Sequence, residues 1–163
     1  MVFLFFIFGR WPQPLKRGVQ ERLFYDGSCG LCHHSVLFAL NREPTPLSDD
    51  EPPPFRFAPL GGYTFEELAE SEDNPFPPLD ELPDSIVVVT ADNEVLTRST
   101  AALYVARRLG GIWRILATPA LIVPRPLRDL VYSAIASLRH RLFKSPENAC
   151  PIVPRDLRSR FEP

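Results

Sequence analysis

Residues 23–32 read Leu23-Phe24-Tyr25-Asp26-Gly27-Ser28-Cys29-Gly30-Leu31-Cys32 and decide the expected fold. A short apolar run ends at the turn pair Asp26-Gly27, and two cysteines with CxxC spacing follow directly before the helix-like residues 36–40. A CxxC at a strand-to-helix junction puts its first sulfur over the helix N-terminus, where unpaired backbone N–H groups and the helix dipole favour a thiolate. The stretch therefore predicts a redox site.

The composition is that of a globular protein with an uneven charge distribution. The chain has 163 residues, of which 45% are hydrophobic and 23% charged, enough for one domain with an ordinary core. Residues 43–94 carry fourteen acidic residues against one basic residue, whereas residues 98–144 carry nine basic residues against one acidic residue. We expect these halves to attract each other or to face charged partners. The bases of residues 98–144 stand singly among apolar residues, which favours a solvated helix surface over an interface with nucleic acid or anionic lipid.

The first eight residues, Met1 to Phe8, are almost wholly apolar. No basic residue precedes them and no small-residue cleavage site follows, so a signal peptide is not expected. Spanning a bilayer takes about 20 helical residues. Residues 1–20 are therefore interpreted as an N-terminal extension of a cytoplasmic protein, with a short membrane-interface anchor as the lesser alternative.

Strand and helix patterns alternate in the first half of the chain. Arg22 to Tyr25 is predicted as a buried strand and residues 30–42 as a helix, in which Cys32, Val36 and Ala39 share an inward face. Residues 55–58 alternate as a second strand, and residues 63–71 form a short acidic helix. Ten of the nineteen prolines lie between residues 44 and 83, which predicts acidic, proline-rich loops at about 44–54 and 72–83.

The second half begins with the clearest strand, residues 85–90, which a turn at 91–93 joins to residues 94–97 as a hairpin. Ser99 or Thr100 is predicted to cap a helix that ends at Gly110-Gly111. A helical tail over residues 112–144 is expected, with breaks at Pro119, Pro124 and Pro126. From residue 127 onward one apolar stripe is formed by Leu127, Val131, Ala134, Leu138 and Leu142.

The resulting order is strand, helix, strand, helix, strand, strand, helix, and then further helices. It predicts an α/β fold with a thioredoxin-like layout, in which a central four-stranded mixed sheet is flanked by helices. Two strands are parallel through a crossover and two form the hairpin. Residues 21–160 are expected to make up this single domain, with the extra helices at its C-terminal end.

Several blocks of sequence resemble one family. The DxxCxxC motif of residues 26–32 carries the resemblance, together with five further blocks: residues 55–60 (FRFAPL), 97–103 (TRSTAAL), 109–114 (LGGIWR), 124–129 (PRPLRD) and 150–151 (CP). Over about residues 22–160 the chain resembles the DCC family of predicted thiol-disulfide oxidoreductases. The resemblance implies a thioredoxin-like fold and a dithiol-disulfide role. We expect no cofactor.

The expected chemistry assigns Cys29 as the attacking thiolate and Cys32 as the resolving cysteine. The substrate would be a disulfide or dithiol in a protein or small thiol. Asp26 either accepts a proton from Cys32 during turnover or caps the turn that precedes the helix. Thioredoxin-like sites face a cis-proline, but here Asp84 or Ser85 is expected in its place.

Other roles remain open for several residues. Cys29 to His33 reads CxxCH, a c-type haem attachment pattern, and a zinc site would recruit a histidine and Cys150, although a second close ligand pair is missing. His33 or His34 could instead stabilise the thiolate from the helix surface. Cys150 is a buried thiol, a third redox cysteine or incidental. Arg98 either ends a strand before the helix cap or contacts an anion at the site rim. An interaction protein on the same fold is the remaining alternative.

Overall fold

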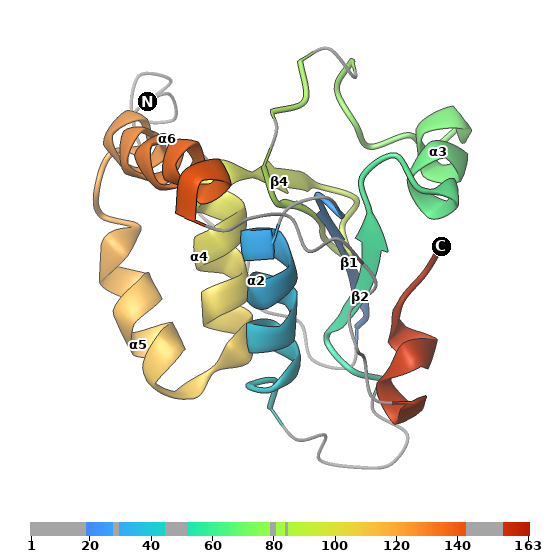
Figure 1. The fold of residues 1–163 in the computed structure, drawn as a ribbon, viewed down its shortest axis with the longest axis horizontal. Helices are drawn as coiled ribbons and strands as arrows, with labels where there is room; N and C mark the ends of the chain where they lie inside the picture. The colour runs from blue at the N-terminus through green and yellow to red at the C-terminus, as the bar shows by residue number, and fades with distance from the viewer. Residues whose placement is uncertain (1–18, 28–29, 45–51, 79–80, 84, 143–154) are drawn as a thin grey trace.

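The computed structural model describes residues 19–27, 30–44, 52–78, 81–83, 85–142 and 155–163 (Figure 1). Four strands and five α-helices are found in these ranges. In chain order they are β1 (Glu21–Tyr25), α2 (Gly30–Leu40), β2 (Phe55–Pro59), α3 (Tyr63–Glu70), β3 (Val87–Val89), β4 (Val95–Thr97), α4 (Arg98–Leu109), α5 (Gly111–Ala120) and α6 (Arg125–Leu142), followed by a 3-10 helix, η1 (Arg155–Arg160).

The strands form one mixed sheet in the order β2-β1-β3-β4. β1 is parallel to β2, with Leu23 opposite Phe57, and α2 lies in the crossover between them. β3 is antiparallel to both β1 and β4, and the β3–β4 pair is the predicted hairpin. The predicted thioredoxin-like α/β fold is therefore confirmed.

Side chains from successive strand positions enter two separate cores. Leu23 and Tyr25 of β1 face α2 and α4, where they join a cluster that includes Phe57 and Val88. Phe24, between them in sequence, faces the other way and packs edge-to-face on Phe65 of α3. This alternation follows from the period of two in a strand. Figure 1 shows the result, with α2 and α4 on one face of the sheet and α3 on the other.

The C-terminal helices differ from the predicted tail in where they break. Pro119 lies inside the last turn of α5, and Pro126 lies in the first turn of α6. Only Pro124, between the two helices, coincides with a break. A proline in a first helical turn costs little because its missing N–H would have no intrahelical partner there.

The start of α4 also differs from prediction. Neither Ser99 nor Thr100 is the N-cap: the helix begins at Arg98, and the cap residue Thr97 makes no side-chain capping bond. Ser99 instead donates hydrogen bonds to Asp129 of α6, from its hydroxyl and from its backbone N–H (3.4 Å). A carboxylate thirty residues away thus accepts a backbone N–H in the first turn of α4. No pattern in the sequence near the helix predicts this contact.

The apolar stripe of α6 is not covered. Leu127, Val131 and Leu138 are exposed, although a stripe of this kind usually faces a core. α5 and α6 pack against α4, through buried residues such as Ala117 of α5. None of the helices in the described ranges is both long enough and apolar enough to cross a membrane.

The C-terminal residues 155–163 lie beside β2. Phe161 pairs with Phe57 in a parallel bridge, and the two rings stack with their centroids 5.4 Å apart. Arg160 of η1 binds the carboxylate of Glu43 and the carbonyl oxygen of Phe55. The end of the chain is therefore part of the packed domain.

Candidate functional site

Cys32 lies in the first turn of α2, just beyond the carboxyl end of β1. Its side chain is half-buried and packs against the core cluster between the sheet and α2, as the spacing of Cys32, Val36 and Ala39 predicts. Asp26 is half-buried in the connection that leads from β1 toward α2. Ser28 and Cys29 lie outside the described residues, so the geometry of the pair stays a prediction.

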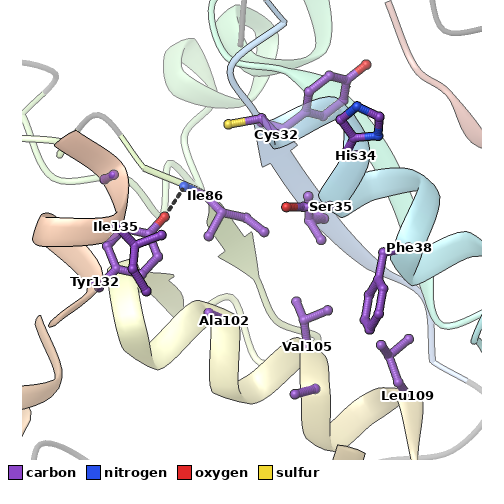
Figure 2. Close-up of a pocket in the computed structure, with 14 residues that line it drawn as sticks. Cys32, His34, Ser35, Phe38, Ile86, Ala102, Val105, Leu109, Tyr132 and Ile135 are labelled. Atoms are coloured by element: carbon purple, nitrogen blue, oxygen red, sulfur yellow. Dashed lines mark hydrogen bonds between the residues drawn. The ribbon is translucent and has the colours of Figure 1, made fainter. Parts of the chain in front are cut away.

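An apolar pocket of about 510 Å³ opens beside Cys32 (Figure 2). Four separate parts of the fold supply its lining: β1, α2, α4 and α6, together with Ile86 before β3. The residues are Leu23, Tyr25, Cys32, His34, Ser35, Phe38, Ile86, Ala102, Val105, Ala106, Leu109, Tyr132, Ile135 and Ala136. Few of them are polar, so the pocket suits an apolar group next to a sulfur.

One end of the pocket is closed by aromatic packing. Phe38 of α2 packs edge-to-face on Trp113 of α5, with the ring centroids 4.8 Å apart. The guanidinium of Arg42 lies 4.2 Å from the centre of the Phe38 ring. Figure 2 shows Phe38 and Leu109 at the end of the pocket away from Cys32. An aromatic contact and a cation–π contact thus hold the Phe38 ring from outside the pocket.

At the other end of the pocket, hydrogen bonds join the elements that line it. The backbone N–H of Ile86 donates to the hydroxyl oxygen of Tyr132 at 3.3 Å, which fixes α6 next to the start of β3. The buried hydroxyl of Ser85 donates to the Ile86 carbonyl and accepts from the Arg98 backbone N–H, both at 3.2 Å. In Figure 2 the Cys32 sulfur is directed toward this side of the pocket.

A buried polar cluster supports β1 from behind the site. The carboxylate of Glu21 accepts hydrogen bonds from the Tyr104 hydroxyl and from Nε of Arg108 at 2.8 Å. Burial, together with the neighbouring Glu21 carboxylate, raises the pKa of Tyr104, so this hydroxyl keeps its proton and stays a donor. The cluster joins β1 to α4, the helix that forms the floor of the pocket.

The remaining predicted site residues are distributed as follows. His34 is exposed but lines the pocket, whereas Arg98 is exposed and has a left-handed φ of 51°. Ser85 is buried and hydrogen-bonded, and no peptide bond between described residues is cis. Asp84, Cys150 and the side chain of His33 lie outside the described residues. Which residue faces Cys29 therefore stays a prediction.

Sequence reasoning missed the contribution of α6. Tyr132 and Ile135 line the pocket although they lie about a hundred residues from the CxxC motif. The signal that the sequence offers is Tyr132 within an apolar helical segment, because a tyrosine hydroxyl needs a hydrogen-bond partner when its ring is buried.

No group of three or more histidine, cysteine, aspartate or glutamate side chains that could hold a metal ion is found in the described ranges. The haem and zinc alternatives need Cys29, Cys150 and the side chain of His33, which lie outside the described residues.

Comparison with known proteins agrees with this geometry. The family model of the DCC1-like thiol-disulfide oxidoreductases matches residues 23–145, which include the CxxC motif and every element that lines the pocket. The chain is also 34% identical over 141 residues to the uncharacterized protein YuxK of Bacillus subtilis (strain 168), covering 86% of this chain and 93% of that protein. No solved structure matches significantly. The chain belongs to the family of DCC1-like thiol-disulfide oxidoreductases.

Proposed function

We propose that the protein exchanges thiols and disulfides through Cys29 and Cys32. The observation that carries the proposal is the position of Cys32 in the first turn of α2 at an apolar pocket. Backbone N–H groups of a first helical turn have no intrahelical acceptors and stabilise a nearby thiolate. The family match covers the same residues.

The reaction would proceed in two displacement steps. The Cys29 thiolate attacks one sulfur of a substrate disulfide, so that a mixed disulfide forms and the released substrate thiolate takes up a proton. Cys32 then loses its proton and attacks the Cys29 sulfur, which forms the Cys29–Cys32 bond and releases the second substrate thiol. Two electrons pass from the dithiol to the substrate, and a dithiol reductant restores the pair. The same steps in reverse oxidise a dithiol substrate.

Asp26 is the proposed proton acceptor for Cys32. It is half-buried and follows the last residue of β1, at the edge of the sheet where α2 begins. If it has this role, Asp26→Asn slows the second step and changes the pH dependence of turnover. If Asp26 instead caps the turn, Asp26→Asn lowers the free energy of unfolding and leaves the pH profile of turnover unchanged.

The pocket favours a substrate with an apolar side chain next to its cysteine. Its lining is almost entirely aliphatic and aromatic, and Cys32 stands at one end. A peptide disulfide can place such a side chain in the pocket while its sulfur stays at the mouth. We further propose a cytoplasmic location, where the thiol pool keeps an exchanging pair mainly as a dithiol.

The test is a redox titration of the purified protein in thiol-disulfide buffers. We expect one two-electron couple in the wild type and none in Cys29→Ser or Cys32→Ser. Cys150→Ser removes the one thiol outside the motif, and because the proposal assigns the exchange to Cys29 and Cys32 alone, it should leave the couple unchanged. Cys32→Ser should also accumulate a mixed disulfide with a peptide substrate.

Two outcomes would contradict the proposal. The first is a couple that persists in Cys29→Ser, since the motif would then not be the exchanging pair. The second is visible haem absorbance or stoichiometric zinc that disappears in Cys29→Ser, which would assign the motif to a bound metal or haem.

A further inference from the structure

We propose that α5 and α6 dock together on the surface of an anionic phospholipid membrane. The two helices present apolar side chains to solvent on consecutive turns, joined by an exposed apolar connection. Docking through this face does not depend on the redox activity, and each can fail without the other.

The exposed face of α5 is an apolar stripe. Ile115 and Leu116 follow Ile112 at spacings of three and four, which places the three residues on one side of the helix. Ile115 is 67% exposed and Leu116 57% exposed, whereas Ala117 is buried on the opposite side, toward α4. The helix thus has an inner apolar side that packs and an outer apolar side that does not.

α6 continues this surface. Exposed residues recur on it at spacings of three and four, namely Leu127, Leu130, Val131, Ala134, Ile135 and Leu138. Ile122 and Val123, which connect α5 to α6, are exposed as well. Isolated exposed apolar residues are ordinary, but a surface of this length on two adjoining helices marks a binding face. We call the exposed residues of α5, α6 and their connection the α5–α6 face.

The charge of the two helices favours anionic lipid as the partner. Residues 111–142 carry five arginines against the single acid Asp129. Arg128 is buried, whereas Arg114 and Arg125 are exposed, and Arg125 pairs with Asp129 at 3.5 Å. The sequence of α6 adds two further arginines, at 139 and 141. Anionic headgroups attract such a segment, with about 1 kcal/mol for each basic residue near the surface. A second copy docked through the same face would bring like charges together, which disfavours a symmetric dimer.

The sequence supplies a second apolar element. Met1 to Phe8 are almost wholly apolar, and Arg10 and Trp11 follow them. Stable attachment at a membrane surface generally takes two signals, and an amphipathic helix pair with an apolar N-terminal segment would meet that requirement.

Docking would bring the pocket to the membrane. Ile135 is 56% exposed on the α5–α6 face and also lines the pocket that contains Cys32. The docked face and the pocket are therefore continuous at this residue. An apolar substrate at the membrane surface would then have a short path to Cys32.

The test is binding of the full chain to vesicles, measured by co-flotation. Vesicles of phosphatidylcholine with about one third phosphatidylglycerol are compared with vesicles of phosphatidylcholine alone. We expect preferential binding to the anionic vesicles, which weakens as salt rises. Ile115→Glu and Leu130→Glu should each lower the partition coefficient by about tenfold, because a charge replaces a side chain that enters the interface.

The matched control is Tyr63→Glu. Tyr63 is 67% exposed, as Ile115 is, but it lies on α3 at the other face of the sheet. Its replacement should leave vesicle binding unchanged. Circular dichroism checks that all variants are folded, and a variant without residues 1–18 measures the contribution of the N-terminal segment separately.

Three results would overturn the inference. One is no binding of the full chain to anionic vesicles at low salt. Another is equal vesicle binding by wild type, Ile115→Glu and Leu130→Glu. This result would also overturn the inference if the variant without residues 1–18 no longer bound, because the N-terminal segment alone would then account for the binding. The third is a dimer in light scattering that Ile115→Glu dissociates while vesicles are not bound, which would assign the face to a second copy.

Discussion

The hydroxyl of Tyr132 accepts a hydrogen bond from the backbone N–H of Ile86, across 46 residues of sequence. This bond connects the start of β3 to α6 at the mouth of the pocket, on the side toward which the Cys32 sulfur is directed (Figure 2). The Tyr132 hydroxyl therefore helps to hold α6 beside the start of β3, and its removal gives the first prediction.

Tyr132→Phe keeps the ring in the pocket but leaves the Ile86 N–H without this acceptor. We expect a loss of about 1 kcal/mol in the free energy of unfolding, and faster hydrogen exchange of the Ile86 amide by about fivefold to tenfold. Urea denaturation and exchange measured by NMR check this. Tyr63→Phe, at an exposed tyrosine, should change neither quantity. Unchanged exchange at Ile86 in Tyr132→Phe would show that the bond does not close the mouth.

Ala102→Leu should separate two kinds of substrate. Ala102 lies on α4 at the floor of the pocket, and a larger side chain there fills the space proposed for an apolar group. We expect kcat/KM for a peptide disulfide with an apolar neighbour to fall by about tenfold. The rate with a small hydrophilic disulfide, which does not use the pocket, should stay the same. Equal losses with both substrates would contradict a role for the pocket in recognition.

Glu21→Gln should lower the free energy of unfolding far more than the loss of a surface ion pair does. Glu21 and Arg108 are 3% and 8% exposed, so the change removes the carboxylate charge with which a buried guanidinium is paired, at a cost of about 3 kcal/mol or more. Arg22→Ala removes the pair with Glu162, in which Arg22 is 45% exposed, and should cost less than about 1 kcal/mol. Thermal and urea unfolding measure both. Similar losses would mean that the buried cluster contributes little to holding β1 against α4.

Glu43 should make stability depend on pH. Burial raises the pKa of this carboxyl above its ordinary value of 4.5, while the hydrogen bond and charge of Arg160 oppose the shift. The folded protein then binds the proton more tightly than the unfolded chain, so this contribution is complete below the ordinary pKa and is lost as pH rises through the raised one. The difference in unfolding free energy between wild type and Glu43→Gln should therefore fall as pH rises above the ordinary pKa of 4.5.

Urea denaturation at several pH values measures that difference, with Glu67→Gln on the exposed surface of α3 as the control. A difference that rises with pH would mean that Arg160 outweighs the effect of burial on Glu43.

Much of the fold was predictable because its signals are local. The β-branched residues of β3 and the turn at residues 91–93 specify the hairpin, and the apolar run before Asp26-Gly27 specifies β1. The position of Cys32 on the inward side of α2 follows from helical spacing to Val36 and Ala39. These features need no knowledge of what lies across the fold.

The rest depends on contacts between distant segments. Asp129 supplies the acceptor for Ser99 at the start of α4, so a capping prediction from the residues beside the helix was wrong. The pocket forms only when α2, α4 and α6 come together, and no single segment contains it. An apolar stripe on α6 is visible in the sequence, but whether it packs or stays exposed depends on the neighbours that the fold provides.

The bridge between Phe57 and Phe161 also affects the tendency of the protein to aggregate at high concentration. β2 is the last strand on its side of the sheet, and a bare edge offers unpaired backbone groups to the strands of other molecules. Phe161 pairs with this edge, and the Glu162 N–H donates to the Phe57 carbonyl at 2.8 Å. Residues 155–163 thus cover part of the β2 edge and oppose self-association. A variant truncated after residue 154 should aggregate under conditions in which it is still folded.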